Sequence, residues 1–380
     1  MQINRSAGLV WRGDERNGRR GFLTTISAGA ALLTFPRCAA AQFWGRRKLG
    51  VALCGLGGYS LGQLGPALRL TQNCKLRGVV TGSPEKGALW AKSYGFSSTN
   101  IYHYDQMVEL AGNPDIDIVY VVTPNALHAR HVIAAAKARK HVICEKPMAV
   151  SVAECDAMLA ACRANNVKLS IGYRLQFEPH YEELKRHARE KDWGAFARMS
   201  GGHSYVMKQP QWRAERKLAG GGPLMDIGIY TIQAACMAAG DVAAVAVTAN
   251  ERPKQRPEFF RDIEETIEWT MEFADGARGD FSTSYNDTLN RFRAEAAKGW
   301  MEFDPAYSYA GGVKVLTQAG PLDLVVPPSQ QAVQIDDFAR CVRDDAQSRV
   351  AGEMGRRDMA IIEAIYASAA QGGKRIEIKT

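Results

Sequence analysis

Apolar and polar positions divide the chain into two parts with different patterns. In the first part, short runs rich in Val, Ile and Leu alternate with helix-length amphipathic stretches. These patterns predict strands at 49–54, 76–80, 116–122 and 141–144, and helices at 61–70, 84–94 and 126–138. Strands that alternate with helices form a parallel sheet with helices on both faces. Because the crossovers of such a sheet are right-handed, few alternatives to a doubly wound Rossmann topology remain.

After residue 173 the pattern changes to successive strands. A helical stretch ends near Glu190, and the later elements are predicted at 245–249, 266–273, 279–285 and 300–303 (strands), 335–342 and 357–370 (helices) and 375–378 (strand). Asp275-Gly276 is typical of a hairpin turn. Strands without intervening helices predict a mostly antiparallel sheet in an α+β unit. We therefore expect an α/β cofactor domain at 48–172 and an α+β substrate and oligomerisation domain at 173–380.

The basic charge of the chain is concentrated at its N-terminus. The 380 residues include 48 Lys and Arg and 40 Asp and Glu, a net charge of +8, which by itself favours a polyanionic partner. Residues 1–41 hold six Arg and two acidic residues, so half of the net charge lies in this segment. The rest of the chain keeps too little charge to support nucleic-acid binding.

The same segment has the layout of an export signal. Its basic residues precede the uncharged stretch 24–35 and the small residues 39–41, which is the pattern of a signal peptide. Arg19 and Arg20 resemble the paired arginines of signals that export folded proteins, and an amphipathic helix is the alternative. We expect cleavage before Gln42 and a periplasmic location. No membrane attachment is expected afterwards, because no later apolar run approaches the ~20 residues of a membrane span.

A glycine-rich turn follows the first predicted strand. Residues 55–60 are Gly-Leu-Gly-Gly-Tyr-Ser, which matches the dinucleotide-binding fingerprint G-x-G-x-x-G/A except for Ser60 in the last place. Gly55 permits the tight turn, Gly57 lets the backbone approach a pyrophosphate, and the N-terminus of the next helix attracts phosphate. The cofactor-binding residues predicted in this turn are Gly55, Leu56, Gly57, Gly58 and Tyr59.

The end of the second predicted strand distinguishes NAD from NADP. NAD sites usually place a carboxylate there, against the ribose, but residues 80–86 are Val-Thr-Gly-Ser-Pro-Glu-Lys, with no carboxylate directly after the strand. Ser83 and Lys86 can bind a 2′-phosphate instead, through a hydroxyl and a point charge, although a small loop shift would bring Glu85 to the ribose. NADP is therefore the expected cofactor, bound at this end by Thr81, Gly82, Ser83 and Lys86.

Polar residues follow two of the buried strands, at the sheet edge where open α/β folds bind ligands. They are Thr123, Pro124, Asn125 and His128 after one strand, and Glu145 and Lys146 after the next. We assign all six to the cofactor site, with His128 expected to hold the turn, and Lys146 also to the substrate. The seven cysteines after the export segment form no Cys-x-x-Cys pair and no zinc pattern, so no metal site is expected.

Four motifs resemble those of the Gfo/Idh/MocA oxidoreductases. They are Gly-Leu-Gly at 55–57, Thr-Pro-Asn-Ala-Leu-His at 123–128, Cys-Glu-Lys-Pro-Met-Ala at 144–149 and Asp-Ile-Gly-Ile-Tyr at 226–230. The resemblance runs from about residue 48 to the C-terminus, and Glu-Lys-Pro is its most specific element. Within the family the chain is most similar to the glucose–fructose oxidoreductases, through the export segment and through 171–174, 212–213 and 218–222.

The resemblance implies hydride transfer between a sugar carbon and NADP. It places Lys146 near the reacting hydroxyl and makes Tyr230 the acid/base group. It also implies that Asp226 accepts a hydrogen bond from a substrate hydroxyl. Many members have His where Tyr230 stands, so assignments from those members do not transfer directly. The resemblance also implies that the open face of the second sheet forms a substrate lid or the interface of a dimer or tetramer.

Elementary chemistry agrees with this role for Tyr230. A free phenol has a pKa of ~10, too high for an efficient base near neutral pH. A neighbouring ammonium and a positively charged nicotinamide both stabilise a phenolate. Asp226 stands four residues before Tyr230 and so shares its helix face. The alternative is a tyrosine that only packs in the core.

Four further residues complete the expected site. Tyr173 and Arg174 end another predicted strand and are assigned to the substrate. For Arg174 the alternatives are support of Tyr230 and an interdomain ion pair. Trp212 can stack on a sugar face, with Arg213 beside it, or pack at the rim. Arg174, Trp212 and Arg213 are also assigned to the cofactor site.

The expected function is that of a periplasmic, NADP-dependent aldose oxidoreductase. An aldose would be oxidised at C1 to its lactone, and a second sugar, ketose or aldose, would then be reduced to an alditol in the same site, in ping-pong fashion. An exported enzyme has no supply of free NADP, so we expect the cofactor to be tightly held. The alternatives are a conventional NAD(P)-dependent sugar or dihydrodiol dehydrogenase with an exchangeable cofactor, and a non-catalytic sugar or nucleotide sensor on the same fold.

Overall fold

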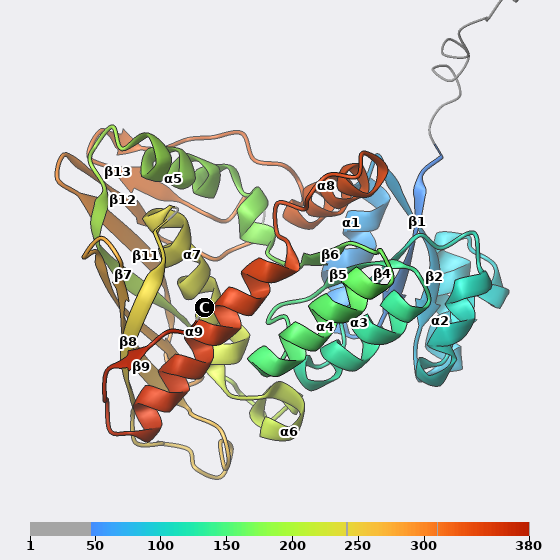
Figure 1. Cartoon of the computed structure of the whole chain (residues 1–380), viewed down its shortest axis with the longest axis horizontal. Coiled ribbons are helices and arrows are strands. Elements are labelled where there is room, and N and C mark those ends of the chain that lie inside the picture. The colour runs from blue at the N-terminus through green and yellow to red at the C-terminus, as the bar shows by residue number, and fades with distance from the viewer. Residues whose placement is uncertain (1–46, 241, 310, 380) are drawn as a thin grey trace, which may run out of the picture. The chain divides into compact units, whose positions relative to one another are not determined.

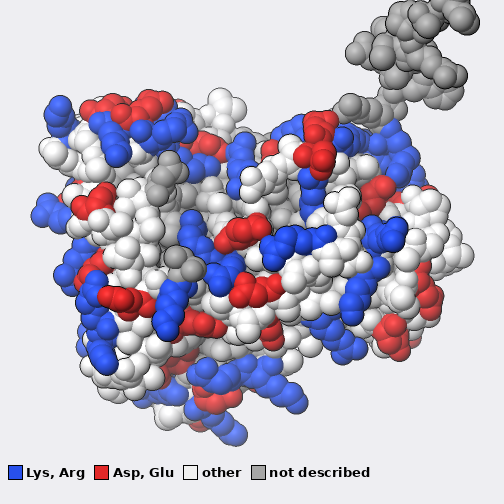
Figure 2. All heavy atoms as spheres, in the orientation of Figure 1, with Lys and Arg blue, Asp and Glu red and all other residues white. Residues whose placement is uncertain are grey.

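The computed structural model describes residues 47–240, 242–309 and 311–379. The predicted export segment 1–41 lies outside these ranges. No helix within them has both the length and the apolar character needed to cross a membrane. On the face shown in Figure 2, basic and acidic side chains are interspersed.

The first domain is built on a six-stranded parallel sheet with the strand order β3-β2-β1-β4-β5-β6 (Figure 1). Its strands are β1 (Leu49–Cys54), β2 (Cys74–Val80), β3 (Ile101–Tyr102), β4 (Ile118–Val121), β5 (His141–Cys144) and β6 (Leu169–Ile171). Its helices are α1 (Gly65–Leu70), α2 (Pro84–Tyr94), α3 (His128–Lys137) and α4 (Val152–Ala164). The strand order reverses between β1 and β4, which is where doubly wound sheets bind their ligands. The predicted Rossmann topology is confirmed.

Local sequence signals explain where these elements begin and end. The apolar runs of β1 and β5 are buried on both sides, as parallel strands under helices require. Helix α2 begins with Pro84 after a Ser83 side-chain cap and ends at Gly95, which has φ +68°. The predicted bounds of these three elements match the structure in full. The predicted helix at 61–70 is instead a π-helical turn at 60–64 followed by α1.

The second domain contains a nine-stranded sheet with the order β14-β13-β12-β11-β7-β10-β9-β8-β15. Its strands are β7 (Phe196–Ser204), β8 (Ala244–Glu251), β9 (Thr266–Phe273), β10 (Arg278–Ser284), β11 (Leu289–Ala296), β12 (Gly299–Phe303), β13 (Val315–Thr317), β14 (Gly320–Pro321) and β15 (Ile376–Glu377). Only the pairing of β7 with β10 is parallel. The predicted mostly antiparallel sheet is therefore confirmed.

Helices cover one face of this sheet (Figure 1). The helices of this half of the chain are α5 (Pro179–Glu190), α6 (Arg216–Ala219), α7 (Ile229–Ala239), α8 (Gln330–Arg343) and α9 (Gly352–Ala370). Helix α7 contacts β7 and β11, α9 contacts β8, and α5 packs on α7. Along β9, buried and half-buried residues alternate, so the sheet has one covered face and one more open face.

Helix α8 belongs to the second half of the chain but packs on the first domain. Its apolar face joins the core of β1, β2 and α1, and Phe338 there is only 1% exposed. The side-chain amide of Gln331 donates to the hydroxyl of Tyr59 in the glycine-rich turn, at 3.1 Å. The expected boundary at 172/173 stays a prediction, and the cofactor domain takes part of its core from the 173–380 segment.

Replacement of Phe338 tests this shared core. Phe338→Ala removes a buried aromatic ring between α8 and the first domain, so we expect the free energy of unfolding to fall by about 3–5 kcal/mol. Leu89→Ala is the matched control, because Leu89 on α2 is 65% exposed and its loss should change stability by no more than about 0.5 kcal/mol. Urea unfolding checks both values. Equal stabilities of the two variants would contradict the packing described here.

Candidate active site

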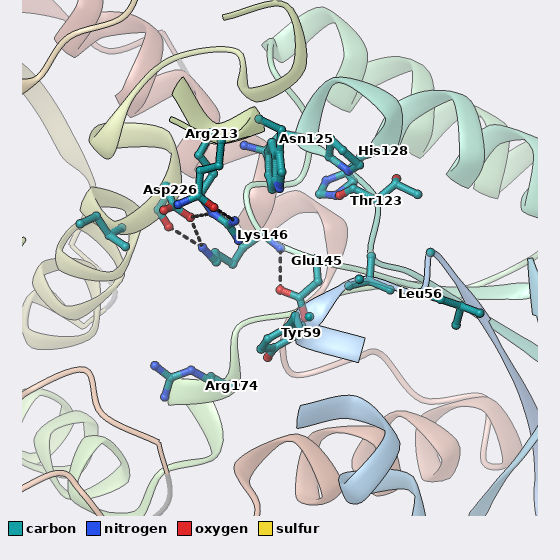
Figure 3. Close-up of a pocket in the computed structure, with 18 of the residues that line it drawn as sticks. Leu56, Tyr59, Thr123, Asn125, His128, Glu145, Lys146, Arg174, Arg213 and Asp226 are labelled. Carbon is teal, nitrogen blue, oxygen red and sulfur yellow. Dashed lines mark hydrogen bonds and ion pairs between the residues drawn. The ribbon is translucent and has the colours of Figure 1, made fainter. Parts of the chain in front are cut away.

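A cavity of about 1120 Å³ lies where the carboxyl ends of β1, β2, β4 and β5 meet the second domain. Every residue predicted for the cofactor site lines it: Gly55, Leu56, Gly57, Gly58, Tyr59, Thr81, Gly82, Ser83, Lys86, Thr123, Pro124, Asn125, His128, Glu145, Lys146, Arg174, Trp212 and Arg213. The predicted catalytic residues Lys146, Asp226 and Tyr230 line the same cavity. The structure thus brings residues from seven separate sequence segments to one place, and Figure 3 shows part of this set.

The glycine-rich turn leaves space for a dinucleotide. Gly55 has φ +108°, and a Cβ there would lie 2.9 Å from the carbonyl oxygen of Val122, so a side chain is excluded on conformational and steric grounds. A Cβ on Gly57 would meet no atom within 4 Å. The hydroxyl of Ser60 donates to the carbonyl of Gly55 at 2.7 Å and closes the turn. The open side at Gly57, next to a helix start, suits a pyrophosphate.

The end of β2 supplies a cation to the cavity. The Ser83 hydroxyl accepts from the amide of Lys86 at 3.3 Å and donates to the Glu85 carboxylate at 2.9 Å. Hydrogen bonds from the amide of Glu85 itself and from the Ser83 hydroxyl lower the pKa of the Glu85 carboxyl. Glu85 is not among the lining residues, whereas Lys86 is. Glu85, the carboxylate that would have favoured NAD, is therefore hydrogen-bonded to Ser83 at the start of its own helix. The ammonium of Lys86 remains at this end of the cavity.

A charged cluster joins the two domains at the centre of the cavity (Figure 3). One carboxylate oxygen of Asp226, Oδ1, lies 3.6 Å from Nζ of Lys146 and 3.1 Å from Nε of Arg213. The other oxygen, Oδ2, accepts from the Tyr285 hydroxyl at 3.2 Å, and Lys146 also donates to the main-chain carbonyl of Asp226. Burial acts to raise the pKa of Asp226, but Lys146 and Arg213 outweigh it and the pKa lies below its usual value. Asp226 is thus a carboxylate that orients Lys146.

Tyr230 lies beside two cations. The ammonium of Lys146 is 4.8 Å from the centroid of its ring, and the guanidinium carbon of Arg174 is 4.9 Å from it. Both distances are within the range of cation–π attraction. Tyr230 is on the first turn of α7, and Asp226 on the π-helical turn at 224–228 just before it. The predicted neighbourhood of Lys146, Asp226 and Tyr230 is present in the structure.

Arg174 is engaged by the protein. It is 2% exposed, and its guanidinium donates to the main-chain carbonyls of Tyr307 and Ser308, at 2.5 and 2.9 Å, and to the side chain of Gln330, at 2.6 Å. All three partners are neutral, so the alternative of an interdomain ion pair is not what forms. Arg174 borders the cavity, but its main contacts hold the segment that contributes Tyr309 to the lining.

Tyr173 does not reach the cavity. Its side chain is 3% exposed and packs in the main hydrophobic core. Burial raises the pKa of its hydroxyl, and the Asp358 carboxylate nearby adds to the effect. The assignment of Tyr173 to the substrate is therefore not supported. Both residues follow β6, and Arg174 begins a short helical turn at 174–177; of the two, Arg174 lines the cavity.

Hydrogen bonds fix the positions of the segments that follow β4 (residues 123–128) and β5 (residues 145–147). The two ring nitrogens of His128 lie 2.9 Å from the carbonyl oxygens of Thr123 and Pro147, so this buried ring links both segments as expected. Asn125 donates to the carbonyl of Ala219 across the domains at 2.9 Å. Glu145 accepts from the Tyr120 hydroxyl at 2.8 Å. The polar atoms of these residues serve mainly to position the cavity wall.

The glycines at 220–222 allow a buried carboxylate to position Asp226. Glu264 accepts from the amides of Gly222 and Leu224, at 3.0 and 3.1 Å, and from the Tyr366 hydroxyl, at 2.8 Å. A Cβ on Gly221 would lie 2.0 Å from that hydroxyl, and one on Gly222 would lie 2.3 Å from the main-chain oxygen of Glu264. Side chains are therefore excluded here by close packing against Glu264 and Tyr366.

Other lining residues were not identified from the sequence. They include Tyr104, His203, Tyr205, Gln211, Ile227, Tyr307, Ser308 and Tyr309. Several come from the end of β7 and the segment after β12. β7 was not predicted, because Gly201, Gly202 and alternating polar residues hide its strand pattern. No group of His, Cys, Asp or Glu in the described parts of the chain is arranged to hold a metal ion.

Family models match both domains. One, described as an oxidoreductase family with an NAD-binding Rossmann fold, covers residues 49–173, and the GFO/IDH/MocA C-terminal domain covers 181–302. The chain belongs to the Gfo/Idh/MocA family of oxidoreductases. The predicted resemblance is confirmed, and an NAD(P)-binding oxidoreductase follows from it, while the family models do not separate NAD from NADP.

Individual members of the Gfo/Idh/MocA family are also similar. The structure of an aldose-aldose oxidoreductase from Caulobacter crescentus, complexed with glycerol, is 38% identical with a TM-score of 0.84, over 87% of this chain and 100% of that one. The D-xylose 1-dehydrogenase [NADP(+)] of Haloarcula marismortui is 27% identical over 83% of this chain and 89% of its own. A trans-1,2-dihydrobenzene-1,2-diol dehydrogenase of Xenopus tropicalis is 35% identical over 38% of this chain and 44% of its own.

Substitution of Glu264 tests its positioning role. Glu264→Gln replaces an acceptor oxygen by an amide that faces backbone N–H groups, so we expect a loss of about 1–3 kcal/mol in the free energy of unfolding. Tyr366→Phe is the matched comparison, because it removes one hydroxyl but keeps the two hydrogen bonds from backbone amides to Glu264. It should lower the free energy of unfolding by less than Glu264→Gln does. Denaturant unfolding measures both, and a Gln variant as stable as the parent would contradict the role.

Proposed function

We propose that this chain is a periplasmic sugar oxidoreductase that retains NADP through its catalytic cycle. It oxidises an aldose at C1 to the lactone and then reduces a second sugar, ketose or aldose, to an alditol. The observation that carries the proposal is the convergence of Lys146, Asp226 and Tyr230 on the cavity that also contains the glycine-rich turn. A hydroxyl bound between Lys146 and Tyr230 would meet both a cation and a proton acceptor.

The relatives support a sugar as the substrate. The relative of known structure that shares 38% of its residues is named an aldose-aldose oxidoreductase, and the Haloarcula relative is named a D-xylose 1-dehydrogenase. The cavity agrees with this class of substrate. Its wall combines aromatic rings with hydroxyl, amide and charged groups, and such a wall can both stack on a sugar ring and bind its hydroxyls.

The residues present fit NADP. The open approach at Gly57 suits the pyrophosphate, and Lys86 with Ser83 at the end of β2 suits a 2′-phosphate. Among the relatives, the Haloarcula enzyme is named for NADP. When bound, NADP supplies a carbon that accepts a hydride from one sugar and returns it to the next.

The chain's own groups handle the proton. Asp226 holds the Lys146 ammonium in place, and Lys146 in turn binds and polarises the hydroxyl at C1 of the aldose. Tyr230 takes the proton of that hydroxyl as C1 is oxidised, and the lactone leaves. In the second half-reaction Tyr230 returns the proton to the carbonyl oxygen of the acceptor sugar, which becomes a hydroxyl. Both half-reactions thus use one proton and one pair of electrons.

Retention of the cofactor follows from the proposed export of the chain. The N-terminal segment 1–41 has the layout of a signal that exports folded proteins, and free NADP is not supplied outside the cytoplasm. A retained cofactor must be regenerated in place, which requires two sugar substrates in turn. We further propose that the enzyme is a homo-oligomer that pairs through the open face of the nine-stranded sheet.

A conventional dehydrogenase is the second candidate. The Haloarcula relative, which aligns with 83% of this chain, carries a dehydrogenase name, and a conventional dehydrogenase exchanges its cofactor at each turnover. The non-catalytic sensor has less support, because a binding protein needs neither Lys146 nor Tyr230 in this arrangement. The amount of nucleotide bound to the purified protein distinguishes the cofactor-retaining enzyme from the conventional dehydrogenase. Turnover of any aldose excludes the sensor.

Replacement of Tyr230 tests the acid/base assignment. Tyr230→Phe keeps the ring beside the two cations and removes the hydroxyl, so we expect kcat to fall by a factor of about 10²–10⁴ with little change in KM. Tyr94→Phe is the control, because Tyr94 on α2 is outside the cavity lining. Steady-state oxidation of aldoses measures both variants. Undiminished kcat in Tyr230→Phe would remove Tyr230 from the mechanism.

Denaturation of the purified enzyme tests the cofactor. We expect about one NADP or NADPH released per chain, identified by chromatography and absorbance, and little NAD. Lys86→Ala should lower the retained NADP by about tenfold or more, since it removes the cation assigned to the 2′-phosphate. Purified enzyme that contains no nucleotide and needs added cofactor would favour the conventional dehydrogenase.

A further inference from the structure

His203 is a lining residue that the proposed chemistry does not use. It stands near the end of β7, and its ring borders the cavity. The ring stacks on Tyr307, with centroids 4.8 Å apart, and meets Tyr230 at a steep angle, with centroids 5.6 Å apart. His203 is therefore held rigidly by aromatic packing and is the neighbour of the proposed acid/base group.

The two ring nitrogens of His203 differ in their surroundings. Nδ1 is buried and makes no hydrogen bond to any residue that the structure describes. A buried acceptor without a partner costs less than a buried N–H without one, so the neutral ring places its proton on Nε2. Because Nδ1 is shut off from the cavity, Nε2 is the nitrogen that can reach a ligand. The ring thus offers one N–H donor to the cavity.

The surroundings keep the ring neutral. Burial lowers the pKa of His203 most and the Arg174 guanidinium next. The Asp226 carboxylate and the Ile227 backbone act in the opposite direction, but with Lys146 adding to the first two the pKa falls to about 3. A neutral ring in this place donates a hydrogen bond from one nitrogen and carries no charge near neutral pH. It is a positioning group and leaves proton transfer to Tyr230.

We propose that Nε2–H of His203 donates a hydrogen bond to the C2 hydroxyl of the aldose. The inference rests on the proposed function, in which the C1 hydroxyl lies against Tyr230. The C2 hydroxyl is next to the C1 hydroxyl on the sugar. His203 is next to Tyr230 in the cavity wall, with the centroids of the two rings 5.6 Å apart. The site is therefore selective for aldoses with a free C2 hydroxyl over their 2-deoxy counterparts.

A pair of sugars and three forms of the enzyme test the proposal. The full-length enzyme, His203→Phe and His203→Gln are assayed with D-glucose and 2-deoxy-D-glucose, or with another aldose pair that the parent oxidises. The parent should prefer the C2 hydroxyl, by a ratio of kcat/KM on the order of tenfold. His203→Phe keeps an aromatic ring on Tyr307 and should reduce this ratio toward one, by a loss confined to the sugar with the hydroxyl. His203→Gln should restore part of it.

The ratio is informative because intrinsic differences between the two sugars are the same for all three forms. His187→Phe is the matched control: His187 also stacks on an aromatic ring, Trp193, at 3.7 Å, but is outside the cavity lining. It should keep the parental ratio. A parental ratio in His203→Phe overturns the inference, as does an equal loss on both sugars. Failure of the parent to oxidise any aldose would instead refute the proposed function.

Discussion

The site depends on a mostly buried ion pair that crosses from one domain to the other. Lys146 follows β5 of the parallel sheet, and Asp226 precedes α7 in the second domain. Each charge alone would be costly to bury, and removal of one partner of such a pair typically destabilises a protein by about 3–5 kcal/mol. The pair therefore fixes the register between the domains as well as the position of the ammonium. Arg213, Tyr205 and Tyr285 also donate hydrogen bonds to the Asp226 carboxylate, so that Asp226 has little freedom to rotate.

Hydrogen bonds on both sides of the Lys146–Asp226 ion pair hold its two residues in place. Glu264 and Tyr366 hold the chain that leads into Asp226, and the glycines at 221 and 222 let that chain approach them. On the opposite side, His128 links the segment after β4 to the segment after β5. The charged groups of the cavity are thus held in place by hydrogen-bonded partners behind them. This arrangement is typical of sites whose reacting groups must be pre-oriented.

The first domain was predictable from sequence to a greater extent than the second. Buried parallel strands produce unbroken apolar runs, and the turn at 55–60 and the segment at 144–147 have short local signatures. In contrast, β7 and β11 have one open face and carry glycine or charge at alternate positions, so their patterns resemble loops. The site residues that depend on them, His203 and Tyr307 among others, have no local motif. Tyr173 was misplaced because sequence proximity to Arg174 does not determine which of two neighbours faces the cavity.

The position of α8 has a consequence for how members of this family can be recombined. The chain leaves the cofactor domain at β6, builds the second sheet, and returns with a helix whose Gln331 contacts Tyr59 and whose Gln330 contacts Arg174. A chimera that exchanges residues 48–172 alone would therefore pair a foreign nucleotide-binding turn with a native α8 and leave a mismatched core beneath it. An exchange of cofactor preference would therefore transfer two separate segments of sequence, residues 48–172 and the helix at 330–343, as a single structural unit.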